Sequence, residues 1–209
     1  MKEIQGPAGR LEARLDRPAG DAKAIVVMAS PYPKHGGTML DKVVYQATQG
    51  FVRAGCAVLR FNYRSVGTSE GEFSDGPGEM DDYRAAIGAA AREFPGMPIW
   101  AAGYSFGAYI AMTAGAADRR VTHLIGIGVV VNDKDDKYDY AAVRASEKPK
   151  FLIHGGLDEL SPAKSIRKFY GELAEPRELV VIDDADHYFD GHVSEVADAI
   201  EDLLENEHA

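Results

Sequence analysis

The stretch from Pro98 to Met112 constrains the fold of this chain more than any other part of its sequence. It begins with an apolar run, continues with Gly-Tyr-Ser-Phe-Gly at 103–107, and goes on in small and apolar residues. Such a run is typical of a strand buried on both faces, and the residues after it have helical character. The glycines beside Ser105 let the backbone take a strained conformation in which neighbouring Cβ atoms would collide. We predict a buried strand, a sharp turn at Ser105 and a helix.

The rest of the sequence alternates apolar runs with helical patterns. Further strands are predicted at residues 2–6, 10–16, 24–29, 57–61, 124–131, 150–154 and 178–183. Further helices are predicted at residues 40–53, 78–94, from Ser161 as N-cap and Pro162 to 173, and at 193–205. Strands that alternate with helices indicate a doubly wound, mostly parallel eight-stranded sheet with helices on both faces and a hairpin at one antiparallel edge.

Composition limits the classes of partner. The 209 residues contain no repeat or linker and are most simply one domain, 1–209. The net charge of −10 argues against nucleic acid or an anionic membrane as a partner. The acidic clusters at 133–139 and 183–186 are expected in solvated loops. Cys56 is the single cysteine and is expected in a buried strand, with no disulfide and no need for a metal or cofactor. No targeting segment or long apolar stretch is present, which predicts a cytoplasmic protein.

A nucleophilic serine needs a general base, and histidine is the usual one. Of six histidines, His187 follows the strand predicted at 178–183 and precedes the last helix, so it can reach back to Ser105. His154 precedes two glycines and is expected to shape that turn. Three of the remaining four are less suitable: His123 has no evident partner, and His192 and His208 are expected to be exposed.

The base in turn needs an acid from another loop at the carboxyl ends of the strands. Asp158 comes first after the glycine turn and is the favoured residue. Glu159 is the rival, although it could instead support the helix predicted from Ser161 through the helix dipole. The acids at 183–186 are too close in sequence to His187 to be favoured as its orienting partner, although Asp186 could tune it. Ser105, Asp158 and His187 therefore form the predicted triad.

These motifs resemble the α/β-hydrolase superfamily, in particular its small lidless bacterial serine hydrolases, over nearly the whole chain. The resemblance is carried by 103–107, 154–158, 186–189 and the loop 60–69, which is similar to the family's D-x-R-G-x-G-x-S with Asn62 and Ser65 replacing Asp and Gly. That loop also contains a second G-x-S-x-G around Ser69. Ser69 is rejected as nucleophile because loop residues, and not a helix, follow it.

The resemblance also implies an oxyanion hole made of two backbone N–H groups. The first would come from Phe106, directly after the nucleophile. The second would come from the loop after the strand at 24–29, which reads Ser-Pro-Tyr-Pro. Because Pro31 and Pro33 have no N–H, Tyr32 is the only donor among residues 31–33. The following residues, 34–39, either rim the pocket or simply lead into the next helix.

Residues 132–149 are too few for a helical cap, so an open, shallow pocket is expected. We predict a serine carboxylester hydrolase that acts on small esters through an acyl-enzyme. A thioesterase or small-peptide hydrolase with the same triad is one alternative, although no phosphate-binding loop or basic cluster favours acyl-CoA. A non-catalytic binding protein with this fold is another alternative. An exposed edge strand or the last helix could mediate a homodimer.

Overall fold

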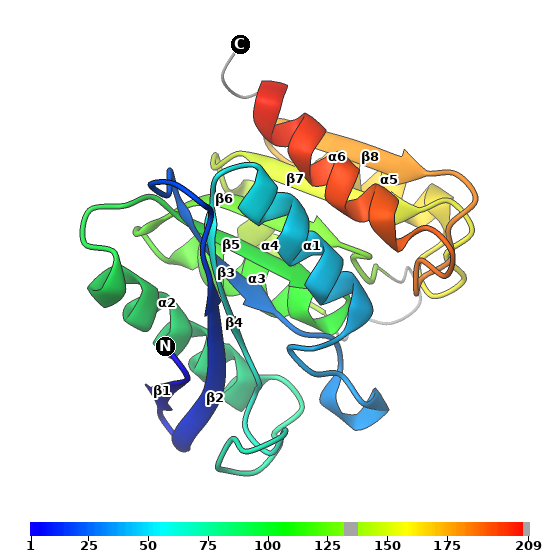
Figure 1. Cartoon of the computed structure of the whole chain (residues 1–209). Helices are drawn as coiled ribbons and strands as arrows, with labels where there is room; N and C mark the ends of the chain where they lie inside the picture. The colour runs from blue at the N-terminus through cyan, green and yellow to red at the C-terminus, as the bar shows by residue number, and fades with distance from the viewer. Residues whose placement is uncertain (132–137, 207–209) are drawn as a thin grey trace.

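The computed structural model describes residues 1–131 and 138–206 and contains one eight-stranded sheet (Figure 1). The strands are β1 (Glu3–Gly6), β2 (Gly9–Asp16), β3 (Ile25–Ala29), β4 (Ala57–Phe61), β5 (Ile99–Tyr104), β6 (Val121–Ile127), β7 (Lys150–Gly155) and β8 (Arg177–Ile182). The helices are α1 (Lys42–Arg53), α2 (Pro77–Glu93), α3 (Phe106–Ala117), α4 (Ala141–Ala145), α5 (Ala163–Glu172) and α6 (Val193–Asn206), with a 3₁₀ turn η1 (Pro33–His35).

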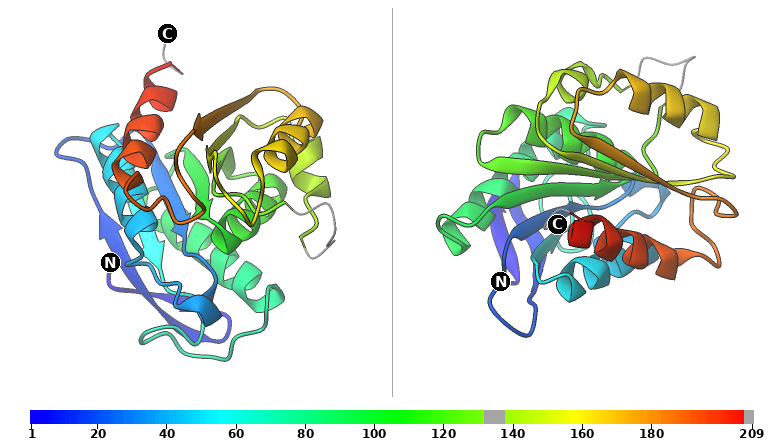
Figure 2. Two further views of the ribbon diagram at one scale, coloured as in Figure 1. Left: turned by 90° about the vertical axis from the view of Figure 1, so that its right-hand side faces the viewer. Right: turned by 90° about the horizontal axis from the view of Figure 1, so that it is seen from above.

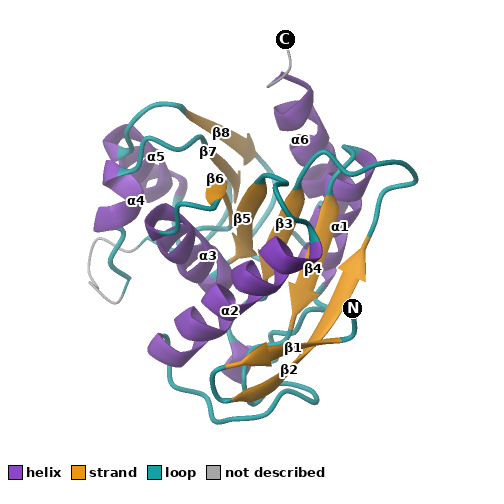
Figure 3. Cartoon of the chain, turned by 90° about the vertical axis from the view of Figure 1, so that its left-hand side faces the viewer, coloured by secondary structure: helices purple, strands orange, loops and turns teal. Residues whose placement is uncertain are grey.

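The strand order across the sheet is β1-β2-β4-β3-β5-β6-β7-β8. The six strands from β4 to β8 in this order run parallel, while β2 pairs antiparallel with β4 and β1 antiparallel with β2. Figure 3 shows this β1–β2 hairpin at one edge, near the start of the chain. The doubly wound, mostly parallel sheet with an antiparallel edge is therefore confirmed.

Helices cover both faces of the sheet. In Figure 2, α1 and α6 lie together on one face, and their buried residues belong to one core, whereas those of α2, α3, α4 and α5 belong to the core on the opposite face. The buried apolar residues divide into two cores in the same way. Every residue of β3, β4, β5 and β7 is buried, which explains their nearly continuous apolar sequence. Cys56 is buried as predicted, but β4 begins one residue after it.

Two predicted boundaries are wrong because tertiary contacts override local patterns. The strand predicted at 124–131 spans Val121–Ile127 instead, because Gly128 turns the chain with φ of 54° and donates its N–H to the carbonyl of Ile153. Ser161 does not cap α5, which begins at Ala163. Its hydroxyl instead bonds to the main chain of Val131.

The segment between β6 and β7 contains α4, a five-residue helix that the sequence did not predict. Most of the acidic cluster expected at 133–139 and the residue His208 lie outside the described residues. Within the described part of this segment there is no helical cap. In residues 1–131 and 138–206, no helix has the length and apolarity needed to cross a membrane.

Candidate active site

The turn between β5 and α3 holds Ser105 in a conformation that L-residues rarely adopt, with φ of 56° and ψ of −119°. A Cβ at Gly103 would lie 2.1 Å from the carbonyl oxygen of Gly107, and a Cβ at Gly107 would lie 2.5 Å from that of Ser30. Both glycines are therefore required by close backbone approach. The turn presents Ser105 at the carboxyl edge of the sheet, directly before the first residue of α3.

His187 lies in the loop after β8 and faces the serine. Its Nε2 is 2.9 Å from Oγ of Ser105, and its side chain is only 5% exposed. Tyr104, the residue before the serine, donates its hydroxyl to the carbonyl of His187 at 2.9 Å. Burial raises the pKa of Tyr104 far above its ordinary value, so the phenol stays a neutral donor. This bond fixes the main chain of His187 relative to the strand that carries Ser105.

Asp158 lies in the loop after β7 and completes the arrangement. Its Oδ2 is 2.7 Å from Nδ1 of His187, and its Oδ1 accepts from the N–H groups of Leu160 and Ser161 at 2.8 and 2.9 Å. Burial acts to raise the pKa of Asp158, but the hydrogen bonds from His187 and Ser161 outweigh it and lower the pKa below its usual value. An ionised Asp158 orients the Nδ1–H of the ring toward itself and leaves the Nε2 lone pair for Ser105. Glu159 is exposed.

His154 shapes the turn after β7, as predicted. Its Nε2 lies 2.7 Å from the carbonyl oxygen of Ser161, and the ring is completely buried. Burial lowers its pKa, so it stays neutral near pH 7. The three other described histidines do not contact Ser105 in this arrangement. His35 packs edge-on against the ring of Tyr32, His123 contacts the rings of Trp100 and Phe151, and His192 is hydrogen-bonded to Glu195.

Ser69, in the second G-x-S-x-G, has a structural role. Its hydroxyl donates to the carbonyl of Asn62 at 2.9 Å and accepts the N–H of Glu12 at 2.9 Å. The bond to Glu12 attaches the loop after β4 to strand β2 of the antiparallel hairpin. The sequence pattern is the same at Ser69 and Ser105, but the surroundings of the two hydroxyls differ.

The two segments predicted to provide oxyanion donors lie side by side. Phe106 is the first residue of α3, where an N–H has no carbonyl from an earlier turn of the helix to bond. Tyr32 follows β3, and its ring packs edge-on against that of Phe106 with centroids 5.3 Å apart. The close approach of Gly107 to Ser30 brings the start of α3 against the end of β3. The role of the two N–H groups remains a prediction.

Two polar residues, one in β4 and one directly after it, were missed as supports of the site. Arg60 is fully buried in β4 and donates to the carbonyl of Met39 at 3.0 Å. Asn62, which stands where the resemblance leads one to expect Asp, accepts the N–H of Met39 at 2.8 Å and donates to Glu12. Together they hold the end of the loop 34–39 against the sheet. In the sequence, the only sign of this supporting role is that two polar side chains stand at the end of an apolar strand.

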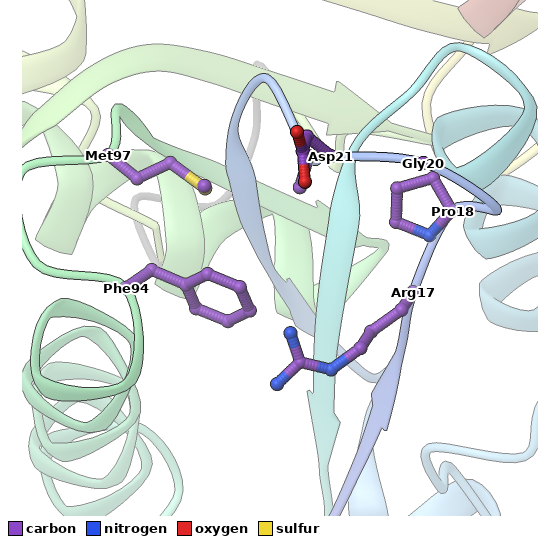
Figure 4. A pocket seen from close by; sticks show the side chains of 7 residues that line it. Arg17, Pro18, Gly20, Asp21, Phe94 and Met97 are labelled. Atoms are coloured by element: carbon purple, nitrogen blue, oxygen red, sulfur yellow. The ribbon is translucent and has the colours of Figure 1, made fainter.

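A pocket of about 350 Å³ lies at the opposite, amino edge of the sheet (Figure 4). It is lined by Arg17, Pro18, Gly20, Asp21, Ala22, Phe94 and Met97. The guanidinium of Arg17 lies 4.9 Å from the ring centroid of Phe94 and forms an ion pair with Glu93 at 2.8 Å. Because Ser105 is at the carboxyl edge, this pocket does not belong to the serine site. Among the described residues, no group of three His, Cys, Asp or Glu side chains could hold a metal.

A half-buried serine and a buried histidine and aspartate are hydrogen-bonded in series, each after its own strand of a mostly parallel sheet. This arrangement defines the class of α/β hydrolases. The chain belongs to this family, since the family model described as "Alpha/beta hydrolase domain" matches residues 24–207. It is similar to an alpha-beta serine hydrolase homologue from Coxiella burnetii, with 32% identity, a TM-score of 0.89, and coverage of 97% of this chain and 95% of that one.

Two further relatives support the same family. A serine hydrolase without lid from Xanthomonas campestris is 30% identical with a TM-score of 0.88, and the match covers 98% of this chain and 93% of that one. An uncharacterized protein from Rickettsia prowazekii is 33% identical over 96% of this chain and 87% of its own length. The resemblance to small lidless bacterial serine hydrolases is thus confirmed.

Proposed function

We propose that this protein hydrolyses small carboxylic esters through an acyl-enzyme on Ser105. The observation that carries the proposal is the unbroken series of hydrogen bonds from Ser105 through His187 to Asp158, with distances of 2.9 and 2.7 Å. A serine hydroxyl is a weak nucleophile by itself, and an adjacent base that is oriented by an acid activates it.

In the proposed reaction, Oγ of Ser105 attacks the ester carbonyl while Nε2 of His187 takes the hydroxyl proton. The resulting oxyanion accepts hydrogen bonds from the N–H groups of Phe106 and Tyr32. The intermediate collapses, and the alcohol leaves with the proton from His187. Water then attacks the acyl-enzyme and gives a proton to His187, which returns it to Ser105 as the carboxylic acid is released. Asp158 stabilises the imidazolium in both steps.

The surroundings of the site favour uncharged esters over acyl-CoA thioesters. Asp183 and Asp184 are exposed in the loop between β8 and His187, and the chain carries a net charge of −10. Phosphates of a CoA group would meet a repulsive potential there. The half-buried ring of Tyr32, which packs against the fully buried ring of Phe106, offers an apolar surface for a short acyl group.

A direct test compares hydrolysis of p-nitrophenyl acetate and butyrate by the wild-type protein, Ser105→Ala and Ser69→Ala. Loss of the nucleophile costs about six orders of magnitude in kcat in a well-studied serine hydrolase, so Ser105→Ala should fall to the background rate. Ser69→Ala removes the same atom from the same sequence pattern and should retain its kcat per folded molecule.

Labelling with a fluorophosphonate separates the alternatives. The wild-type protein and Ser69→Ala should each gain one covalent label, and Ser105→Ala none. A wild-type protein that is neither labelled nor active would indicate a non-catalytic binding protein. Ester turnover that persists in Ser105→Ala would contradict the assignment of the nucleophile. Faster turnover of a matched acyl-CoA than of the esters would replace the ester by a thioester as the substrate.

A further inference from the structure

The side chain of Tyr32 joins three segments around the site. Its hydroxyl donates to Oδ1 of Asp75, in the loop before α2, at 2.8 Å. Its ring is in edge contact with the ring of Phe106, at the start of α3, and with that of Phe73, with centroids 5.3 and 5.4 Å apart. The hydrogen bond with Asp75 raises the pKa of Tyr32, so the phenol remains a donor to the carboxylate. The loop after β3 is thus attached to a loop more than forty residues further along the chain.

The main chain on both sides of Asp75 is fixed by a buried carboxylate. Glu79, in the first turn of α2, is fully buried and accepts the N–H groups of Ser74 and Gly76 at 3.0 and 2.7 Å. Asp75 itself has a φ of 56°, in the left-handed region that few residues other than glycine adopt and that aspartate tolerates. Asp75 therefore has little freedom to move away from Tyr32, although its side chain is exposed.

The main chain of Tyr32 is fixed on its carbonyl side. The carbonyl oxygen accepts the N–H groups of His35 and Gly37 at 3.0 and 3.2 Å, and these bonds close the turn around η1. They bind residues within one loop and do not attach that loop to the nucleophile. The Tyr32 side chain makes that attachment, because it reaches both Phe106 and Asp75. An oxyanion donor must be placed within a few tenths of an ångström to stabilise the transition state.

We propose that Asp75 is a positioning residue for the oxyanion hole, which holds the Tyr32 hydroxyl and thereby keeps the Tyr32 N–H aligned with that of Phe106. The inference rests on the proposed function, because it assigns Asp75 a role in the same ester hydrolysis. Asp75 does not touch the substrate. It acts through the orientation of the loop after β3.

The test measures kcat and KM for p-nitrophenyl butyrate in Tyr32→Phe, Asp75→Gly and the double variant. Glycine is chosen because it accepts a φ of 56° without strain. Each single variant should lower kcat about tenfold with KM changed less than about twofold, since a small misplacement of a catalytic group affects the transition state most. The double variant should be no slower than the slower single variant, because both changes remove one interaction. The inhibition constant of a trifluoromethyl ketone, whose adduct with Ser105 carries an oxyanion, should rise in parallel with the fall in kcat.

Two further variants control for general effects. Asp75→Asn keeps an acceptor oxygen and tolerates the left-handed conformation, so it should restore kcat to within about threefold of the wild type. Glu72→Gln neutralises an exposed carboxylate of the same loop and should leave kcat unchanged. Three outcomes would each overturn the role of Asp75. They are a wild-type kcat in Tyr32→Phe, effects of the two changes that multiply in the double variant, and a change confined to KM. These results are distinct from a failure of the proposed function, which would appear as turnover retained by Ser105→Ala.

Discussion

Nε2 of His154 lies 3.6 Å from Oδ2 of Asp158, and both side chains are completely buried. The neighbouring carboxylate favours a charged imidazole, but burial is the larger effect and lowers the pKa of His154 from its ordinary value of 6.5. The loop that carries Asp158 is therefore built around a neutral histidine.

This burial predicts a pH dependence of stability. The folded protein resists protonation of His154, so the unfolded chain binds more protons once the pH falls below about 6.5, and stability is lost as the pH falls further. His154→Gln keeps an N–H donor for the carbonyl of Ser161 but cannot titrate. In urea unfolding between about pH 8 and pH 5, the wild type should lose more free energy of unfolding than this variant. Parallel losses in the two proteins would show that His154 does not contribute.

Asp158→Asn should abolish most activity while the fold is kept. An amide can donate to Nδ1 of His187 and so leave the proton on Nε2, where it prevents the ring from accepting the Ser105 proton. In a serine protease the corresponding change costs about four orders of magnitude in kcat. Glu159→Gln alters the adjacent, exposed carboxylate and should leave kcat within about twofold. Steady-state hydrolysis of p-nitrophenyl butyrate decides between the two acids, and equal losses would contradict the assignment.

Gly107→Ala should destabilise the turn after the nucleophile. The new methyl group would lie 2.5 and 2.6 Å from the carbonyl oxygens of Ser30 and Ala29, which are main-chain atoms and cannot rotate away. Such overpacking typically costs about 1–3 kcal/mol, and the displaced turn should also lower kcat. Gly88→Ala, inside α2, meets no atom closer than 3.5 Å and should raise the free energy of unfolding by roughly 0.5–1 kcal/mol. Thermal and urea unfolding of the two variants should give shifts of opposite sign.

Lys148→Met should lower stability and leave the chemistry intact. The ammonium group donates to the carbonyl oxygens of Gly115 and Asp118, both at 2.6 Å, at the end of α3 that is remote from Ser105. Loss of these charge-assisted bonds should cost about 1–3 kcal/mol. Lys164→Met changes an exposed lysine of α5 and should be nearly neutral. Active-site titration with a fluorophosphonate gives kcat per folded molecule, which should be equal in both variants and the wild type.

The parts of the site that depend on a single strand and its loop could be predicted from the sequence. The apolar run before Ser105, the glycines around it, and the loops that carry Asp158 and His187 each have a local pattern. The structure brings these three side chains together at the carboxyl edge, where parallel strands deliver their loops. The order of the parallel strands in the sheet places the three loops close to one another.

The parts that depend on contacts between distant segments could not be predicted. Ser161 has the local pattern of an N-cap, but its hydroxyl bonds to Val131 instead. The apolar residues after Gly128 look like a continued strand, yet the left-handed glycine ends β6. Asp75 carries no motif, and its relation to Tyr32 emerges only when two loops fold together. In each case the interacting residue is too far away in sequence for a local pattern to predict the contact.

The positions of β5 and β8 in the sheet predict how activity is lost on heating or in denaturant. Ser105 follows β5, which pairs on both sides, whereas His187 follows β8, which pairs only with β7 and whose residues are mostly half-buried. Edge strands with few buried apolar residues open locally before the whole domain unfolds. Heat or mild denaturant should therefore abolish activity while most of the secondary structure persists. Cooling, or dilution of the denaturant, should restore the activity. The half-life of activity under such conditions then depends on how readily β8 detaches from β7. Substitutions that strengthen the β7–β8 pairing should lengthen that half-life.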